Sequence, residues 1–217
     1  MKISARALAL AAAMILGGAA ASLVTSHAIS KEPRFPQLTL DALNDQQRPL
    51  GEKILKISSV GLAGPYNPML RSPVMAQRMY DLLDYLRWHT SVPTKLNEFA
   101  ILIQARLWRS QVEWFAHYPL ALKAGLPERV GADLKANKRP EGMADDEAAV
   151  YDFCMELANR HVVSDETYDR AHKLLGDQGV VDLVAVSGTY VAIAMLLSAA
   201  EEGVPPGKEP PFKPGEP

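Results

Sequence analysis

The chain has 217 residues, 48% of them hydrophobic, and a formal net charge of −2. A chain of this length can form one domain with a sizeable core, and its mildly acidic charge excludes the basic surface that a nucleic-acid partner requires. The single cysteine, Cys154, excludes an intrachain disulfide, a CxxC redox pair and a metal site built from several cysteines.

The first 28 residues are predicted to be a signal peptide. Lys2 and Arg6 form a short basic start, the stretch from Ala7 to Val24 is almost entirely apolar, and Ser26-His27-Ala28 supplies small residues at a cleavage site. We therefore expect a periplasmic or secreted protein. The alternative is an uncleaved anchor at the lower limit of spanning length, so a membrane is an expected partner only if this segment is retained.

Residues 29–60 are predicted to form an N-terminal extension and the first helix. Pro33 and Pro36 favour an extended start, and apolar residues on one side predict a helix over 46–57. Residues 61–68, with two glycines and two prolines, predict a loop.

The next helix has a clear start signal. Ser72 is a capping residue and Pro73 suits the first helical position, and apolar residues at helical spacing continue the helix to about Trp88. Further helices are predicted over 94–108 and 110–124. Pro119 lies inside the second of these and is expected to kink or shorten it.

The C-terminal half is also predicted to be helical. Helices are expected over 145–160 and from 164 to about 176, followed by a largely apolar helix over 180–202 that is either central or covered by a partner. Residues 204–217 form a Pro-rich tail, disordered or draped over the domain. No alternating pattern is long enough for a convincing strand, so the fold class is all-α.

Three ionisable residues, Glu98, Glu113 and His117, lie in a strongly apolar and aromatic stretch. Glu113 and His117 are i, i+4 neighbours on one helical face, and Glu98 can reach them only if the chain folds back. Carboxylates and an imidazole that converge in an apolar pocket are typical of proton-transfer sites. The alternatives are a solvated surface pair for Glu113 and His117, and a helix-dipole role for Glu98.

Several stretches together resemble the carboxymuconolactone decarboxylase family, which also contains the D-type alkylhydroperoxidases. The resemblance covers residues 61–203 and rests on Gly64-Pro65-Tyr66-Asn67-Pro68, Arg71-Ser72-Pro73, Glu98-Phe99-Ala100-Ile101-Leu102, Glu113-Trp114-Phe115-Ala116-His117, Ala124-Gly125-Leu126 and Val181-Asp182-Leu183-Val184. It implies an alkylhydroperoxidase D-like helical bundle, assembly into homo-oligomers, and a small-molecule substrate handled without metal or organic cofactor.

The peroxidase branch of this family has two cysteines between its glutamate and its histidine. Glu98 and His117 match the outer positions of that pattern, but Ser110 and Glu113 occupy the cysteine positions. Without a thiol pair, peroxide cannot be reduced through a disulfide, so the protein is not expected to be a thiol peroxidase. The chain resembles the thiol-free, decarboxylase-like branch, although export of such an enzyme departs from that branch.

The resemblance implies a lyase that decarboxylates a small organic acid or lactone by acid–base chemistry. His117, oriented by Glu113, is the expected proton donor, and Glu98 is the second acid–base group. Arg106 and Arg109 are candidates to bind a substrate carboxylate through a bidentate fork. Tyr66 and Trp114 are candidates to line the substrate pocket, whereas Tyr190 is expected mainly to pack in the core.

Other readings of the same residues remain open. The site could hydrolyse or isomerise a lactone, or the scaffold could serve as a non-catalytic helical binding or assembly protein. Two carboxylates and a histidine could also hold a divalent ion, but no second closely spaced histidine and no HExxH pattern is present, so no metal is expected.

Overall fold

The computed structural model describes residues 32–58 and 60–213. Every regular element in these ranges is a helix, which confirms the all-α prediction. The predicted signal peptide at 1–28 and the last four residues of the Pro-rich tail lie outside the described residues.

The N-terminal elements form one hydrophobic cluster. They are the 3₁₀ helix η1 (Leu40–Ala42) and the α-helices α1 (Arg48–Ile57), α2 (Tyr66–Met69) and α3 (Pro73–Trp88). The short α2 lies in the segment predicted to be a loop, whereas α3 has the predicted bounds. The cluster also includes residues from the C-terminal part of the chain; its buried members are Leu43, Leu50, Ile54, Leu62, Met69, Leu70, Ala76, Ile193 and Leu197.

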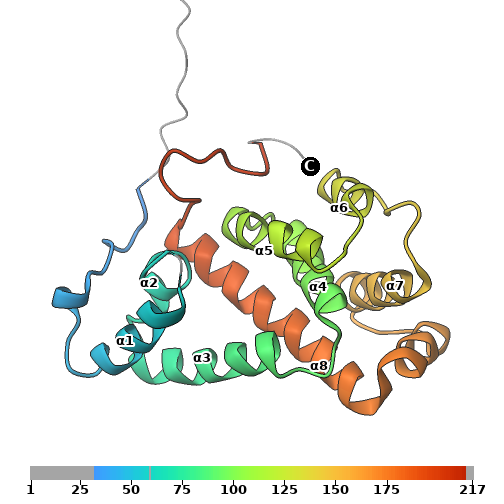
Figure 1. Cartoon of the computed structure of the whole chain (residues 1–217), viewed down its shortest axis with the longest axis horizontal. Helices are drawn as coiled ribbons and strands as arrows, with labels where there is room; N and C mark the ends of the chain where they lie inside the picture. The colour runs from blue at the N-terminus through green and yellow to red at the C-terminus, as the bar shows by residue number, and fades with distance from the viewer. Residues whose placement is uncertain (1–31, 59, 214–217) are drawn as a thin grey trace, which may run out of the picture. The chain divides into compact units, whose positions relative to one another are not determined.

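The central helix is α4 (Thr94–Leu107), in which every residue from Leu96 to Arg106 is buried. It pairs with α5 (Gln111–Lys123), and the two helices lie side by side in Figure 1. Pro119 does not shorten α5, since the helix continues through it to Lys123. Pro119 is exposed, so the backbone carbonyl that loses its helical hydrogen bond can be hydrated.

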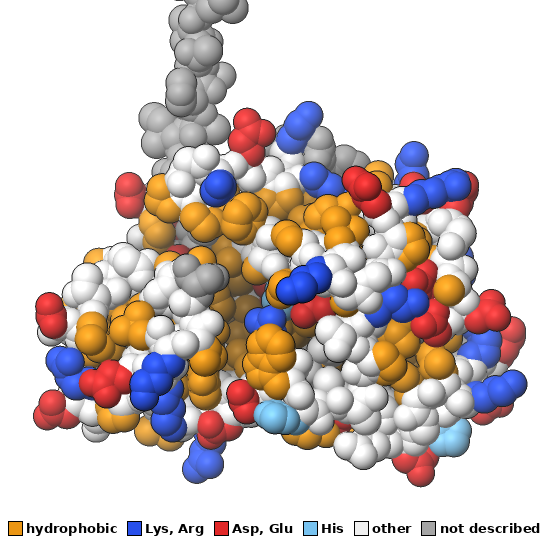
Figure 2. Space-filling model, viewed as in Figure 1, with side chains coloured by type: hydrophobic (Ala, Val, Ile, Leu, Met, Phe, Trp, Pro, Cys, Tyr) orange, Lys and Arg blue, Asp and Glu red, His pale blue; other side chains and the backbone are white. Residues whose placement is uncertain are grey.

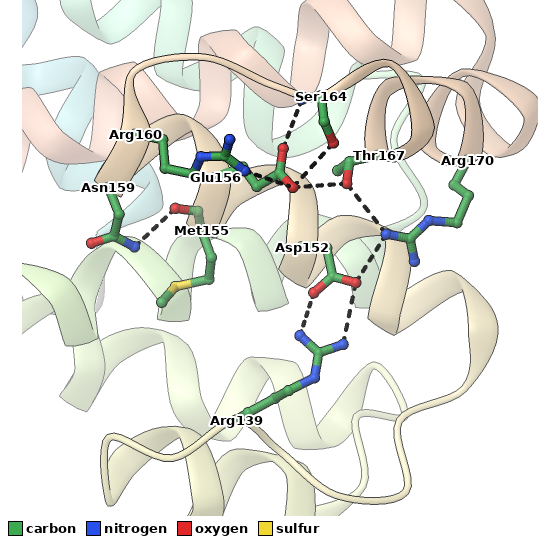
Figure 3. A network of polar contacts seen from close by, with 9 residues as sticks. All are labelled: Arg139, Asp152, Met155, Glu156, Asn159, Arg160, Ser164, Thr167 and Arg170. Carbon is green, nitrogen blue, oxygen red and sulfur yellow. Dashed lines mark hydrogen bonds and ion pairs between the residues drawn. The ribbon is translucent and has the colours of Figure 1, made fainter.

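On the other side of α4 lies α7 (Asp145–Arg160), which follows the short helix α6 (Glu128–Lys135). A network of polar contacts joins α7 to the start of the last helix (Figure 3). Glu156 accepts hydrogen bonds from the backbone N–H and hydroxyl of Ser164, and Asp152 pairs with both Arg139 and Arg170. These contacts fix the turn at 161–164 between the two helices.

The last helix, α8 (Asp165–Ala200), contains one break, at Gly176. The φ of Gly176 is +67°, a left-handed conformation that glycine adopts without a Cβ clash. The predicted end of a helix near 176 and the start of another are therefore both confirmed. In the described part of the chain α8 alone is long and apolar enough to cross a membrane, but 56% of its most apolar stretch is buried in the domain, as in a core helix.

The described segment after α8, residues 201–213, returns along the domain and passes beside α5, as Figure 1 shows. Gln111 donates a hydrogen bond to the carbonyl of Phe212 and accepts one from its backbone N–H, at 2.8 and 2.9 Å. The Phe212 ring is 3% exposed and contacts the Trp114 ring edge-on, with centroids 5.2 Å apart. The described part of the Pro-rich tail is therefore draped over the domain.

Candidate active site

Glu98 and His117 form a buried hydrogen-bonded pair. Nδ1 of His117 lies 2.7 Å from Oε2 of Glu98, and the two residues are 5% and 6% exposed. The pair is possible because the chain folds back between α4 and α5, with Arg109 in a left-handed conformation (φ +51°) at the turn. The predicted meeting of the early glutamate with the histidine is thus found in the structure.

This contact sets the proton arrangement on the imidazole. The carboxylate of Glu98 accepts a hydrogen bond from Nδ1–H of His117, which leaves Nε2 as the ring nitrogen available for proton transfer. The His117 ring also meets the Tyr190 ring edge-on, with centroids 5.0 Å apart. The imidazole is therefore held by a carboxylate on one side and by an aromatic ring on another.

Glu113 is buried without a hydrogen-bond partner. It is 3% exposed, and neither carboxyl oxygen meets a partner in hydrogen-bonding geometry among the described residues. Burial raises the pKa of Glu113 to about 8, and the nearby Ser110 hydroxyl offsets part of this rise even though the two groups do not form a well-aligned hydrogen bond. At neutral pH this carboxyl is therefore mainly protonated and can donate a hydrogen bond.

The structure pairs His117 with Glu98 and not with Glu113, which we had expected to orient it. The i, i+4 spacing does place Glu113 and His117 on one buried face of α5. However, the packing of α5 against α4 brings the carboxyl group of Glu98 from across the helix pair to Nδ1. The two glutamates therefore have different environments: Glu98 is hydrogen-bonded to His117, whereas Glu113 has no hydrogen-bond partner among the described residues.

Arg87, on the last turn of α3, was not predicted from the sequence. One of its terminal nitrogens lies 3.9 Å from Oε1 of Glu98, and its side chain is 26% exposed. A cation in the last turn of a helix is expected for the dipole alone, so nothing in the local sequence distinguishes this arginine. Only the packing of α3 near α4 identifies it as part of the site.

Two tyrosines complete the cluster. Tyr66 on α2 and Tyr190 on α8 both have a pKa raised by burial, and for both the charge of Arg87 offsets part of the rise. Glu98 and Glu113 raise the pKa of Tyr190 further. These mutual effects show that the two hydroxyls and the three charged or ionisable groups share one region of the protein. Tyr66 was predicted to line the site, whereas Tyr190 was expected mainly to pack in the core.

Three of the predicted substrate-binding residues have contacts elsewhere. Nε of Arg106 donates to the carbonyl of Lys135, and its guanidinium lies over the Phe212 ring, 5.4 Å from the centroid. Arg109 donates to the carbonyl of Lys213. Trp114 is 2% exposed and stacks on Tyr118. These contacts tie the three side chains to α6, to α5 and to the C-terminal segment, and their role in substrate binding stays a prediction.

A reactive cysteine and a metal centre have less support than the acid–base cluster. Cys154 is fully buried, with Sγ 3.6 Å from the Ser187 hydroxyl, and burial raises the pKa of its thiol to about 12. Among the residues that the structure describes, no group of three His, Cys, Asp or Glu side chains is arranged to hold a metal ion.

The surface near these elements is hollowed. Figure 2 shows a recess with hydrophobic walls, which lies between helices α1 to α3 on one side and helix α5 on the other. Tyr66, Arg87 and His117 come from α2, α3 and α5, and Tyr66 and Arg87 are only partly buried. These three helices border the recess, and the three side chains belong to the acid–base cluster described above.

Comparisons with known proteins define the fold. No family model matches the chain, and no curated protein matches it. One similar structure is the alkylhydroperoxidase AhpD core of an uncharacterized peroxidase-related protein from Ralstonia eutropha; its TM-score is 0.65 at 14% identity, over 77% of this chain and 89% of that chain. Another, an uncharacterized peroxidase-related protein from a Silicibacter species, has a TM-score of 0.64 at 14% identity, over 81% of this chain and 94% of that chain. The chain therefore has the predicted alkylhydroperoxidase D-like helical fold.

Proposed function

We propose that this protein is a cofactor-free acid–base enzyme similar to carboxymuconolactone decarboxylases, acting on a small organic acid or lactone. The observation that carries the proposal is the buried Glu98–His117 pair in one cluster with the unpartnered carboxyl of Glu113. A buried carboxyl with no partner costs stability, so its presence needs a reason. Shared fold does not assign chemistry, and these three side chains supply the argument.

The proposed reaction breaks the bond between a substrate carbon and its carboxylate. The electron pair of that bond moves into an adjacent lactone or carbonyl group while carbon dioxide leaves. The oxygen that gains this charge is stabilised by a hydrogen-bond donor. Glu113, kept neutral by burial, is the proposed donor.

A proton must then reach the substrate carbon. His117 in its protonated form donates the Nε2 proton, keeps the Nδ1 proton on the hydrogen bond to Glu98, and regains a proton from water after product release. In this scheme Glu98 orients the imidazole, and Glu113 stabilises charge. The roles of the two glutamates are thus exchanged relative to the sequence-based expectation.

The experiment incubates the purified full-length protein with γ-lactones that carry a carboxylate on the carbon next to the lactone carbonyl, and with matched lactones that lack this carboxylate. Carbon dioxide release and ring opening are measured in parallel. We expect carbon dioxide from carboxylated compounds, and its loss in His117→Gln but not in His172→Gln, which changes an exposed histidine of α8. Ring opening without carbon dioxide would instead support the lactone hydrolase alternative. Equal turnover by wild type and His117→Gln would remove His117 from the mechanism.

We also propose export and self-assembly. The basic start, apolar stretch and small residues of segment 1–28 support cleavage and a periplasmic or secreted location. Val181, Val184 and Met195 expose at least 44% of their surface on α8, and an apolar face of this kind supports a homo-oligomer. N-terminal sequencing of the exported protein tests the first proposal, and light scattering of the purified protein tests the second.

A further inference from the structure

Arg87 holds a distinctive position in the acid–base cluster. Its guanidinium comes from α3, while the other members of the cluster come from α2, α4, α5 and α8. It reaches Glu98 on the carboxylate oxygen opposite the one that binds His117, since Arg87 approaches Oε1 and His117 contacts Oε2. Glu98 therefore lies between the imidazole and the guanidinium.

Among the described residues Arg87 makes an ion pair and a cation–π contact but no hydrogen bond. A guanidinium has five N–H donors. The 3.9 Å approach to Glu98 is an ion pair but too long for a hydrogen bond. Nε of Arg87 is buried and has no hydrogen-bond partner among the described residues. A buried donor without a partner needs an explanation, and an anion bound to the partly exposed guanidinium would supply one.

The surroundings of Arg87 keep the guanidinium in place and direct its charge toward the site. Its central carbon lies 4.9 Å from the centroid of the Trp88 ring, a cation–π contact that limits the motion of the group. Its charge offsets part of the rise in pKa that burial causes in Tyr66 and Tyr190, so the charge acts on residues of both α2 and α8. About a quarter of the side chain is exposed, which leaves a path for a small anion.

We propose that Arg87 binds the substrate carboxylate and makes the site selective for a carboxylate anion over the corresponding neutral ester. The inference rests on the proposed function and names the residue that holds the substrate there. The guanidinium can take the carboxylate on its unused edge while Glu98 remains on the other side, because its planar fork suits two carboxylates at once. Arg106 and Arg109 are less suited, since each donates to a backbone carbonyl away from the acid–base pair.

This placement also orders the substrate. With its carboxylate against α3, the rest of a small molecule extends toward α5, where His117 and the neutral Glu113 carboxyl lie. The proposed substrate therefore carries two carboxylates: Arg87 binds the one that is retained, and the other leaves as carbon dioxide from the less polar surroundings of His117 and Glu113. Arg87 is thus a substrate-binding residue that positions the reacting carbon and transfers no proton.

The test measures binding by calorimetry on the full-length protein, so that it does not depend on turnover. The probes are 5-oxotetrahydrofuran-2-carboxylate and 4-oxopentanoate, each compared with its methyl ester. Wild type is expected to prefer the acid over the ester by about tenfold or more, which corresponds to one well-formed ionic contact. Arg87→Gln is expected to lose that preference and Arg87→Lys to retain part of it. Arg78→Gln, an exposed change on the same helix, is the matched control and should keep the full preference.

The outcomes separate this inference from the proposed chemistry. If Arg87 has only a structural role, Arg87→Gln should change the unfolding temperature but keep the wild-type ratio of acid affinity to ester affinity. That result overturns the inference. A wild type that binds acid and ester equally well also overturns it. If Arg87→Lys folds and shifts the ratio, a folding defect in Arg87→Gln does not affect the conclusion. His117→Gln should keep the acid preference, so loss of turnover with retained binding supports both proposals. An Arg87-dependent preference in a protein that releases no carbon dioxide supports the binding site and contradicts the decarboxylation.

Discussion

Nδ1 of His117 and Oε2 of Glu98 meet at 2.7 Å across the interface between α4 and α5, nineteen positions apart in the sequence. The contact favours the Nδ1–H form of the ring and leaves Nε2 as the nitrogen that does not contact Glu98. Both residues are almost fully buried, so bulk water does not compete for the hydrogen bond. The two helices must therefore pack correctly before the imidazole is oriented for proton transfer.

The first prediction concerns this orientation. Glu98→Leu removes the acceptor at Nδ1, so the imidazole should no longer be held in one tautomer, and any turnover that depends on His117 should fall about 10²- to 10⁴-fold. Long-range ¹H–¹⁵N spectra of the histidine rings report the tautomer directly. Wild type should show His117 protonated at Nδ1. Unchanged ring nitrogen signals of His117 in Glu98→Leu would contradict the role assigned to Glu98.

The second prediction concerns Glu113 and pH. Burial raises the pKa of Glu113 in the folded protein to about 8 from the usual 4.5. The folded state therefore keeps a proton that the unfolded state releases, and the stability from the neutral carboxyl, complete below pH 4.5, is lost as pH rises toward 8. Glu113→Gln cannot ionise, so it should be increasingly more stable than wild type from pH 5 to pH 8.

The free energy of unfolding, measured in urea across this pH range, checks the second prediction. The difference between variant and wild type should grow by about 1 kcal/mol for each pH unit. Glu166→Gln, an exposed change near the start of α8, serves as the control and should show no such growth. A difference that stays constant from pH 5 to pH 8 would show that Glu113 is already ionised at neutral pH.

The third prediction concerns Asp182, which joins α8 to the turn between α3 and α4. Burial by itself raises the pKa of Asp182, but hydrogen bonds from the Ser91 N–H and from the hydroxyls of Ser91, Thr90 and Tyr85 lower it overall. Asp182→Asn weakens these charge-assisted bonds and should destabilise the protein by about 1–3 kcal/mol at pH 7. The pKa is depressed in the folded state, so this stabilisation is present above the usual carboxyl pKa of 3.8 and is lost as pH falls below it.

Chemical denaturation at pH 7 and at pH 3 tests the third prediction. The gap between wild type and Asp182→Asn should shrink at pH 3 because Asp182 takes up a proton in the unfolded state below its usual pKa of 3.8, which favours unfolding of the wild type. Asp165→Asn, an exposed acid at the start of the same helix, provides the comparison. An equal gap at both values would mean that the charge of Asp182 does not strengthen the network.

A fourth prediction concerns the reactivity of Cys154. Burial raises the pKa of the thiol to about 12, so almost no thiolate forms near neutral pH, and the sulfur is fully covered by the fold. The native protein should react with a thiol reagent such as 5,5′-dithiobis(2-nitrobenzoate) at least about 10³-fold more slowly than the protein unfolded in guanidinium chloride. Rapid labelling of the native protein at a rate close to that of the unfolded chain would exclude a buried, inert thiol.

Local signals predicted much of the fold. Ser72 and Pro73 mark the start of α3, and the acidic first turn at 145–147 marks the start of α7; both helices have the predicted bounds. The break at Gly176 was also predicted, because a glycine in the left-handed region needs no tertiary support. Short helices were missed. The four residues of α2 and the eight of α6 form where surrounding packing compensates for weak local signals.

The candidate site could be predicted only where one stretch of sequence carries the pattern. Glu98, Glu113 and His117 stand out as ionisable residues among apolar ones, and all three are buried. Which glutamate binds the imidazole depends on the packing of two helices, and local spacing favoured the wrong one. Arg87 comes from a different helix and looks like an ordinary helix-end cation, so its approach to Glu98 follows only from the tertiary structure.

The last prediction concerns the C-terminal segment, whose composition suggests a tail without fixed structure. Phe212 is nevertheless 3% exposed, with its ring against Trp114 and its backbone held twice by Gln111. Phe212→Ala should therefore lower the free energy of unfolding by about 3 kcal/mol, the usual cost of removing a buried phenylalanine. Phe35→Ala, at a position that is 38% exposed, should cost clearly less.

Since Trp114 lies on the same helix as Glu113 and His117, Phe212→Ala should also loosen α5, detectable as faster hydrogen exchange of its backbone amides. If Phe212→Ala unfolds at the same urea concentration as Phe35→Ala, the C-terminal segment does not stabilise the domain by packing against α5.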